Sequence, residues 1–288
     1  MPKSVLITGG EGMLATDLQP VLTEHGYQVS AFSRQELDIT NPQVVEKVVS
    51  DVSPDVVINT AVFHVEPCED DEQKAYAVNA LGPELLAKVS ARRGIEFMQI
   101  STCGLFGDEV REYSEYDPVV LKTVYARSKY EGEVATQRFC PHSYIVRLGW
   151  LFGGKEEHAR NFVAARIREA EGKDSLQSAG DKYGSPTCTG DAIQMILSLL
   201  DEKCYGVTHV NNTGIASRAD YVEACLRAAG ISKPVERVDS SHFPRKANVP
   251  DCEALTSYRS SYFGLEPLPH WQEALERYVH THLKGMIK

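Results

Sequence analysis

Residues 4–25 carry the feature that most limits how this chain can fold. An apolar run, Ser4–Thr8, leads into Gly9-Gly10-Glu11-Gly12, and the following residues place apolar side chains at helical spacing. This order predicts a buried strand, a glycine turn and a helix. In such a unit Gly9 supplies the tight turn, and Gly12 lets a pyrophosphate come close to the backbone. The helix begins at Met13 and Leu14, and the free N–H groups at its N-terminus favour an anion. The segment therefore predicts a dinucleotide-binding turn, whereas a merely structural glycine turn is the alternative.

Strands and helices alternate through the first half of the chain. Such alternation predicts an α/β fold built on a Rossmann-type, doubly wound parallel sheet. We expect residues 1–150 to form the dinucleotide-binding domain and residues 151–288 to form mainly a small C-terminal α/β substrate lobe, with later elements free to return to the sheet. Residues 69–93 predict one long helix, and residues 231–269 predict irregular structure. Further strands are expected at Gln28–Phe32, Val56–Asn59, Glu96–Ile100, Ser143–Leu148 and Val207–Val210.

The residues after the second and third strands bear on which cofactor binds. The second strand ends in Ser33-Arg34 and lacks the acid that would hold a ribose 2′-hydroxyl, so Arg34 favours a 2′-phosphate. A solvated loop arginine is the alternative, and the cofactor is either NADPH or NADH. Asp38 either caps the next helix or contacts adenine together with Ile39. Ala61 and Val62 are small enough for a cofactor to lie close to the chain.

A second constellation predicts proton transfer. Ser101-Thr102 ends the fourth strand, and Tyr125 and Lys129 are four residues apart, which places them on one face of a helix. A free tyrosine ionises near pH ~10, and a neighbouring lysine cation lowers that pKa. Thr102 offers a hydroxyl to a carbonyl oxygen. The predicted catalytic residues are Thr102, Tyr125 and Lys129, with Ser101 beside the cofactor. Taken alone, the Tyr/Lys pair is more typical of a surface helix with a solvated lysine.

Composition narrows the classes of partner. The net charge is −10 and no Lys/Arg-rich run occurs, which argues against nucleic-acid binding and requires a local basic site for any anionic substrate. No apolar run is long enough to span a membrane, and the N-terminal run is too short for a signal peptide. The seven cysteines are scattered without a C-x-x-C pair. We expect a cytoplasmic protein with free thiols and no catalytic metal.

Taken together, these motifs resemble those of the extended short-chain dehydrogenase/reductases, and within them the dTDP-4-dehydrorhamnose reductase family. The likeness covers nearly the whole chain. It rests on residues 7–14, 37–41, 77–83, 100–102, 125–129, 146–153, 161–163 and 184–187.

The resemblance implies that an NAD(P)H-dependent enzyme reduces the C4 ketone of a dTDP-linked 6-deoxy-4-keto sugar. It implies that Tyr125 donates the proton, that Lys129 lowers its pKa and holds the nicotinamide ribose, and that Thr102 hydrogen-bonds the keto oxygen. The substrate side would include Thr102, Cys103, Trp150 and Asn161, although Trp150 fits a core position equally well.

This chain departs from the family pattern on the sugar side. Cys103-Gly104 stands where the family usually has Asp-Tyr, and Val249-Pro250 where it usually has Arg-Pro, with Arg245 or Lys246 as a substitute cation. Two other functions stay open. One is a non-catalytic NADP-binding regulatory subunit of the methionine adenosyltransferase beta type, and the other is an epimerase or reductase of a different nucleotide sugar. A monomer or homodimer is expected.

Overall fold

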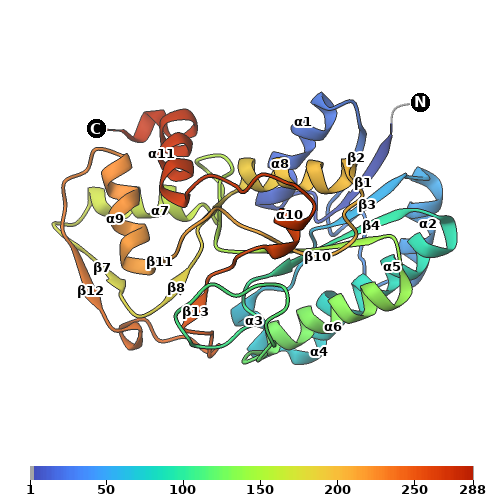
Figure 1. Ribbon diagram of the computed structural model, residues 1–288, viewed down its shortest axis with the longest axis horizontal. Coiled ribbons are helices and arrows are strands. Elements are labelled where there is room, and N and C mark those ends of the chain that lie inside the picture. The colour runs from blue at the N-terminus through green and yellow to red at the C-terminus, as the bar shows by residue number, and fades with distance from the viewer. Residues whose placement is uncertain (1–2, 288) are drawn as a thin grey trace.

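A parallel six-stranded sheet forms the centre of the larger part of the protein (Figure 1). The computed structural model describes residues 3–287. The strand order is β10-β5-β4-β3-β1-β2, and every pairing is parallel. The prediction of a Rossmann-type sheet is confirmed. The strands are β1 (Ser4–Thr8), β2 (Gln28–Phe32), β3 (Val56–Asn59), β4 (Glu96–Thr102), β5 (Ser143–Leu148) and β10 (Gly206–Val210).

Helices cover both faces of this sheet (Figure 1). On β1, Val5 and Ile7 pack into one apolar cluster and Leu6 into the other, because successive side chains of a strand point to opposite faces. Burial on both faces explains why these strands are continuous apolar runs in the sequence. One face holds α1 (Met13–Glu24) and α8 (Thr189–Asp201), and the other holds α2 (Pro42–Val52), α5 (Gly82–Arg93) and α6 (Val124–Phe139).

The strand order places a topological switch point between β1 and β3. The chain leaves β1 towards α1 on one face of the sheet, and it leaves β3 towards the helices of the other face. In open α/β sheets, ligands bind at the carboxyl ends of the strands beside such a point. The residues after β1, β3 and β4 therefore define where the site lies.

The single long helix expected over residues 69–93 is wrong. The structure has α3 (Val65–Asp70), α4 (Glu72–Tyr76), a π-helical turn η1 (Ala77–Leu81) and then α5. The break falls at Asp71, whose backbone leaves helical geometry at φ −143° and whose side chain accepts a 2.9 Å hydrogen bond from Lys74 N. Asp71 thus caps a new helix, which periodicity alone does not reveal.

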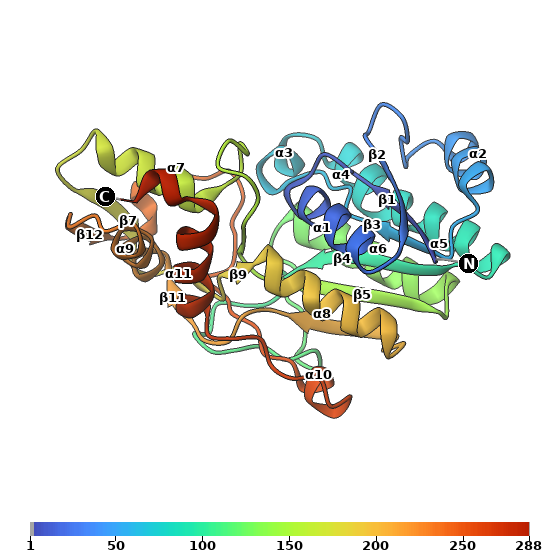
Figure 2. The same ribbon diagram turned by 90° about the horizontal axis from the view of Figure 1, so that it is seen from above.

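Some elements beyond residue 150 return to the larger part of the protein. Strand β10 pairs with β5, and α8 packs against α1. Most of the remaining chain forms a smaller lobe, in which α7 (Phe162–Glu171), α9 (Arg218–Ala228) and α11 (Trp271–His282) share one apolar core (Figure 2).

Short strands and turns complete the chain. The stretch 231–269, expected to be irregular, contains four short elements, so that expectation is wrong in detail. Their small size explains why no periodicity marks them. The short elements are β6 (Leu151–Phe152), β7 (Leu176–Ala179), β8 (Tyr183–Gly184), β9 (Thr187–Cys188), β11 (Ala216–Ser217), β12 (Val235–Val238), η2 (Ser240–His242), β13 (Cys252–Glu253), α10 (Tyr258–Tyr262) and η3 (Lys284–Met286).

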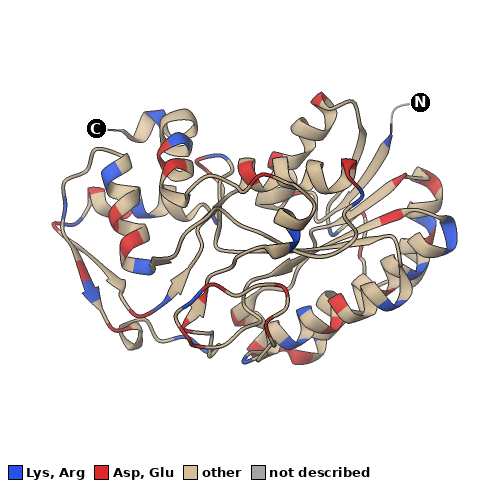
Figure 3. Ribbon diagram, in the orientation of Figure 1, with Lys and Arg blue, Asp and Glu red and all other residues tan. Residues whose placement is uncertain are grey.

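Acidic and basic positions are interspersed over both parts of the protein (Figure 3). All seven cysteines are buried free thiols. Within residues 3–287, no helix has the length and apolarity to cross a bilayer. The same residues contain no group of three or more His, Cys, Asp or Glu side chains arranged to hold a metal ion.

Candidate active site

The turn between β1 and α1 fits a dinucleotide pyrophosphate. Gly9 has φ +66°, and a Cβ atom there would lie 2.9 Å from Ala61 N, so a larger residue is excluded. Gly12 N donates to Gly9 O at 2.9 Å, and Gly12 begins α1 without a side-chain cap. The N–H groups of the first helical turn, at Met13 and Leu14, are therefore left to bind an anion.

A pocket beside this turn is lined by six of the thirteen residues predicted to hold the cofactor. Arg34 is exposed at its rim. Ser33 is not among the lining residues; its N–H donates to Glu36 at 2.8 Å. Leu37, Phe63 and Val78 line the pocket without having been predicted. The predicted residues that line it are Gly9, Arg34, Asp38, Ile39, Ala61 and Val62.

The Asp38 side chain stabilises the turn at residues 38–40 and does not cap the next helix. Its Oδ1 accepts hydrogen bonds from Thr40 Oγ1 at 2.7 Å and Thr40 N at 2.9 Å, and these bonds lower the pKa of the carboxyl group. Helix α2 is capped by Asn41, whose side chain accepts from Gln43 N and Val44 N. The helix-cap alternative for Asp38 is therefore wrong, and its place in the cofactor pocket remains.

Thr102 and Tyr125 meet at the end of β4. Thr102 is the last residue of that strand, and Tyr125 lies in the first turn of α6. Thr102 Oγ1 accepts a 3.1 Å hydrogen bond from Gly104 N, so its own proton is free to be donated. Burial raises the pKa of Tyr125, and a hydrogen bond with the Thr102 side chain partly opposes that rise. The phenol is thus held in its protonated form beside a second hydroxyl donor.

Lys129 lies one turn further along α6 and is only 3% exposed. Its Nζ donates a 2.6 Å hydrogen bond to Ile100 O, and burial lowers its pKa to about 8 against the opposing charge of Glu133. The expectation that Lys129 leaves Tyr125 with a lowered pKa is not met here, because burial of the phenol dominates. Ser101 is also committed elsewhere: its hydroxyl donates to Glu133.

Asn79 joins the loop after β3 to the catalytic helix. Its side chain accepts from Phe63 N at 2.9 Å, donates to Phe63 O at 2.9 Å, and donates to Ser128 Oγ at 3.1 Å. Asn79 is buried within the π-helical turn η1, where an extra residue in the turn reorients side chains. The loop that carries Val62 is therefore positioned by a residue to which sequence reasoning assigned no role.

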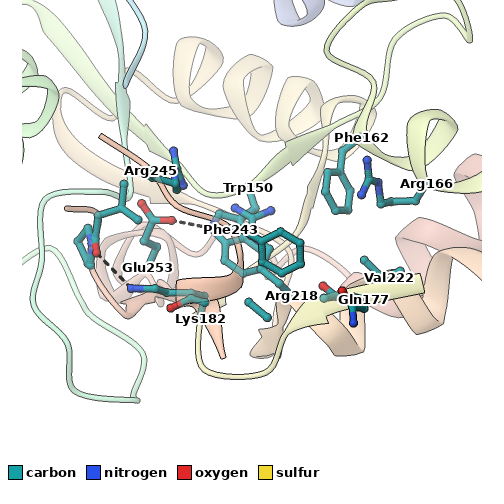
Figure 4. A pocket seen from close by; sticks show the side chains of 15 residues that line it. Trp150, Phe162, Arg166, Gln177, Lys182, Arg218, Val222, Phe243, Arg245 and Glu253 are labelled. Atoms are coloured by element: carbon teal, nitrogen blue, oxygen red, sulfur yellow. Dashed lines mark hydrogen bonds between the residues drawn. The ribbon is translucent and has the colours of Figure 1, made fainter. Parts of the chain in front are cut away.

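A second pocket is lined by residues between Trp150 and Glu253 (Figure 4). Trp150 is half-buried and forms part of its wall. The guanidinium carbon of Arg218 lies 3.4 Å from the Trp150 ring centroid, and Trp150 Nε1 donates to Glu253 Oε2 at 2.7 Å. The charged residues that line the pocket are Arg166, Lys182, Arg218, Arg245 and Glu253, and its large apolar residues are Trp150, Phe162, Val222 and Phe243.

These lining residues come from separate segments, so no local motif marks them. Of the two proposed substitute cations, Arg245 lines the pocket while donating to Glu66 at 2.6 Å, whereas Lys246 pairs with Asp70 at 2.5 Å on the surface. The local basic site that an anionic ligand requires is present despite the negative charge of the whole chain.

Two residues predicted on the substrate side are buried. Asn161 is 2% exposed; its side chain accepts from Ala164 N at 3.0 Å as the cap of α7 and donates to Tyr278 Oη at 2.6 Å. Cys103 is 5% exposed within an apolar cluster that includes Leu105 and Ala126. The hydrogen bonds of Asn161 are all made within the lobe, which argues against substrate contact, whereas substrate contact by Cys103 stays a prediction. The helix-start position of Asn161 was the signal for its capping role.

A glycine turn on a Rossmann-type sheet, joined to a strand-end threonine and a Tyr/Lys pair on the next helix, defines an extended short-chain dehydrogenase/reductase. The sequence profile of the RmlD substrate binding domain family matches residues 3–283, and the chain belongs to this family. The predicted resemblance is thereby confirmed.

Individual relatives match over nearly the whole chain. The dTDP-4-dehydrorhamnose reductase of Mycolicibacterium smegmatis is 36% identical over 281 residues, which cover 96% of this chain and 85% of that protein. The spore coat polysaccharide biosynthesis protein SpsK of Bacillus subtilis is 32% identical, with 96% of both chains covered. The crystal structure of dTDP-4-dehydrorhamnose reductase from Bacillus anthracis in complex with NADP has a TM-score of 0.93 and 31% identity, covering 97% of this chain and 99% of that one.

Proposed function

We propose that the protein reduces the C4 ketone of a nucleotide-diphosphate 4-keto-6-deoxy sugar with a nicotinamide cofactor. The family relatives named dTDP-4-dehydrorhamnose reductase and the NADP complex of the Bacillus anthracis relative support the reaction class and the cofactor. The observation that carries the proposal is the cationic, aromatic pocket beside the Thr102–Tyr125 pair.

The cofactor supplies the hydride, and the protein supplies the proton and the orientation. Gly9 and the N-terminus of α1 hold the pyrophosphate, and Arg34 receives the 2′-phosphate when NADPH binds. Tyr125 donates its proton to the keto oxygen while Thr102 hydrogen-bonds the same oxygen. Lys129 then stabilises the resulting phenolate by its charge.

The pocket of Trp150 suits the nucleotide diphosphate. Its aromatic and aliphatic walls fit a base, and its guanidinium groups fit phosphate oxygens. Arg166 Nε is buried and has no hydrogen-bond partner within residues 3–287. A buried unpaired donor costs roughly 1–3 kcal/mol. A phosphate oxygen that accepted a hydrogen bond from Arg166 Nε would remove this cost.

The retained proton-transfer residues favour turnover over a purely regulatory role. A non-catalytic binding subunit would need the glycine turn that holds the cofactor. It would not need Thr102, Tyr125 and Lys129 to lie close to one another. We further propose that the protein works in the cytoplasm as a monomer or homodimer on small-molecule substrates, with no nucleic-acid partner. The acidic net charge of −10 supports this last point.

Turnover tests the proposal directly. Purified protein is mixed with NADPH or NADH and enzymatically made dTDP-4-keto-6-deoxyhexose, and the nicotinamide absorbance is followed. We expect consumption that depends on the keto sugar. Absence of consumption with both cofactors, across several 4-keto sugar nucleotides, would contradict the reductase function.

A further inference from the structure

The Glu253 carboxylate enters the catalytic end of the Trp150 pocket from β13. Its Oε2 accepts the 2.7 Å hydrogen bond from Trp150 Nε1. Its Oε1 lies 2.9 Å from the point that a Cβ atom on Gly104 would occupy, so the absence of a side chain there makes room for the carboxylate. Within residues 3–287 Oε1 has no hydrogen-bond donor, and Glu253 is therefore held at one oxygen only.

The same point brings Glu253 close to the reacting groups. Thr102 Oγ1 lies 3.5 Å from the position of a Gly104 Cβ atom, so both oxygens border one small space. Glu253 is also near enough to Tyr125 for its charge to act on the phenol. The unpaired carboxylate oxygen therefore lies near Thr102 and Tyr125, the residues proposed to hold the keto oxygen.

Arg218 leaves this oxygen available. Its guanidinium group stacks on the Trp150 ring. The charges of Arg218 and Glu253 act on each other, but within residues 3–287 the two side chains form no ion pair or hydrogen bond. Glu253 is half-buried and lines the pocket. A partly desolvated carboxylate oxygen gains most from a hydroxyl or ammonium donor and repels a second carboxylate.

We propose that Glu253 is a specificity-determining residue, which accepts a hydrogen bond from the substrate hydroxyl on the ring carbon beside the ketone. This inference rests on the proposed reduction at C4. In a 4-keto-6-deoxy sugar, C5 carries only a methyl group and a hydrogen, so the donor beside the ketone is the C3 hydroxyl. Glu253 therefore selects sugars with a donor at C3 and rejects sugars with an anionic group there.

The test compares two substrates in the wild type, two Glu253 variants and one control variant. kcat/KM is measured for dTDP-4-keto-6-deoxyhexose and for its 3-deoxy analogue in the wild type, Glu253→Ala and Glu253→Gln. Glu276→Gln, a loss of an exposed carboxylate on α11, is the control. NADPH binding, followed by nicotinamide fluorescence, shows that each variant is folded.

We expect the wild type to prefer the hydroxylated substrate by about 10- to 100-fold, the range of a hydrogen bond to a charged group. Glu253→Ala should bring that ratio near one, mainly through KM, and Glu253→Gln should keep part of it because an amide oxygen still accepts. An equal loss for both substrates, with the ratio unchanged, would mean that Glu253 only holds Trp150 and would overturn the inference alone. A wild type that reduces neither substrate nor any other 4-keto sugar nucleotide overturns the reductase proposal and this inference with it.

Discussion

Lys129 donates a 2.6 Å hydrogen bond from its buried ammonium group to the carbonyl oxygen of Ile100, in the strand that ends at Thr102. This bond anchors α6 to β4. It also leaves the cation in a buried site, where desolvation lowers the pKa of Lys129 to about 8. The charge proposed to stabilise the Tyr125 phenolate is therefore lost within an accessible range of pH.

The first prediction follows from that pKa. Below pH 8 Lys129 is charged, and above it the amine becomes neutral and no longer stabilises the phenolate, so kcat/KM should be level below and should fall above. The raised pKa of Tyr125 keeps the phenol protonated throughout. The measurement is kcat/KM for NADPH as a function of pH, and Lys129→Met is expected to remove the alkaline limb. A wild-type profile that is flat through pH 8 would contradict the assignment.

Tyr125→Phe should lower kcat by about 10²- to 10⁴-fold, because it removes the proton donor and leaves the ring in place. NADPH affinity should change little. Steady-state kinetics and fluorescence titration measure the two effects. Tyr76→Phe, the same chemical change on α4, should leave both unchanged. If Tyr125→Phe retains wild-type turnover, another group donates the proton.

Arg34→Ala tests the 2′-phosphate contact. Arg34 is exposed at the rim of the cofactor pocket, so its loss should not disturb the fold. We expect the Kd for NADPH to rise by about 10- to 100-fold, with little change for NADH, which lacks the phosphate. Lys47→Ala, which removes an exposed cation paired with Asp51 on α2, is the control. An equal effect on both cofactors would make Arg34 a general rim residue.

The parts of the site that lie close together in the sequence could be predicted from it. The Gly9 turn is set by residues that are neighbours along the chain, and the Tyr125–Lys129 pair needs only helical spacing. The strands β1, β2, β3 and β5 begin and end at the predicted residues. Burial on both faces leaves β1, β3 and β5 as largely apolar runs, whereas β2 lies at the exposed edge of the sheet.

The rest depends on contacts between distant segments. One pocket is lined by Arg218 from α9, by Lys182 from the loop before β8, and by Glu253 from β13. No spacing rule links these three residues in the sequence. Asn161 was placed beside the substrate because it belongs to a shared motif, but motif membership does not say where a side chain points. Its hydrogen bonds to Ala164 and Tyr278 show that it holds α7 instead.

The same dependence on distant contacts gives the last prediction, at Glu133. This carboxylate is 1% exposed and pairs with Arg147, which is 4% exposed, at 2.6 Å. Glu133→Gln leaves the Arg147 charge buried with a weaker partner, and loss of one member of such a pair lowers the free energy of unfolding by about 3–5 kcal/mol. Chemical denaturation measures this loss.

Glu133→Gln should also move the alkaline limb of the pH profile. The Glu133 charge raises the pKa of Lys129 against the effect of burial, so its removal lowers that pKa below about 8 and the decline in kcat/KM begins at a lower pH. Glu131→Gln, an exposed neighbour on the same helix, should change neither stability nor the limb. A purely structural Glu133 would lower stability and leave the limb in place. A limb that moves in Glu133→Gln and stays fixed in Glu131→Gln therefore identifies Glu133 as the residue that keeps Lys129 charged near neutral pH.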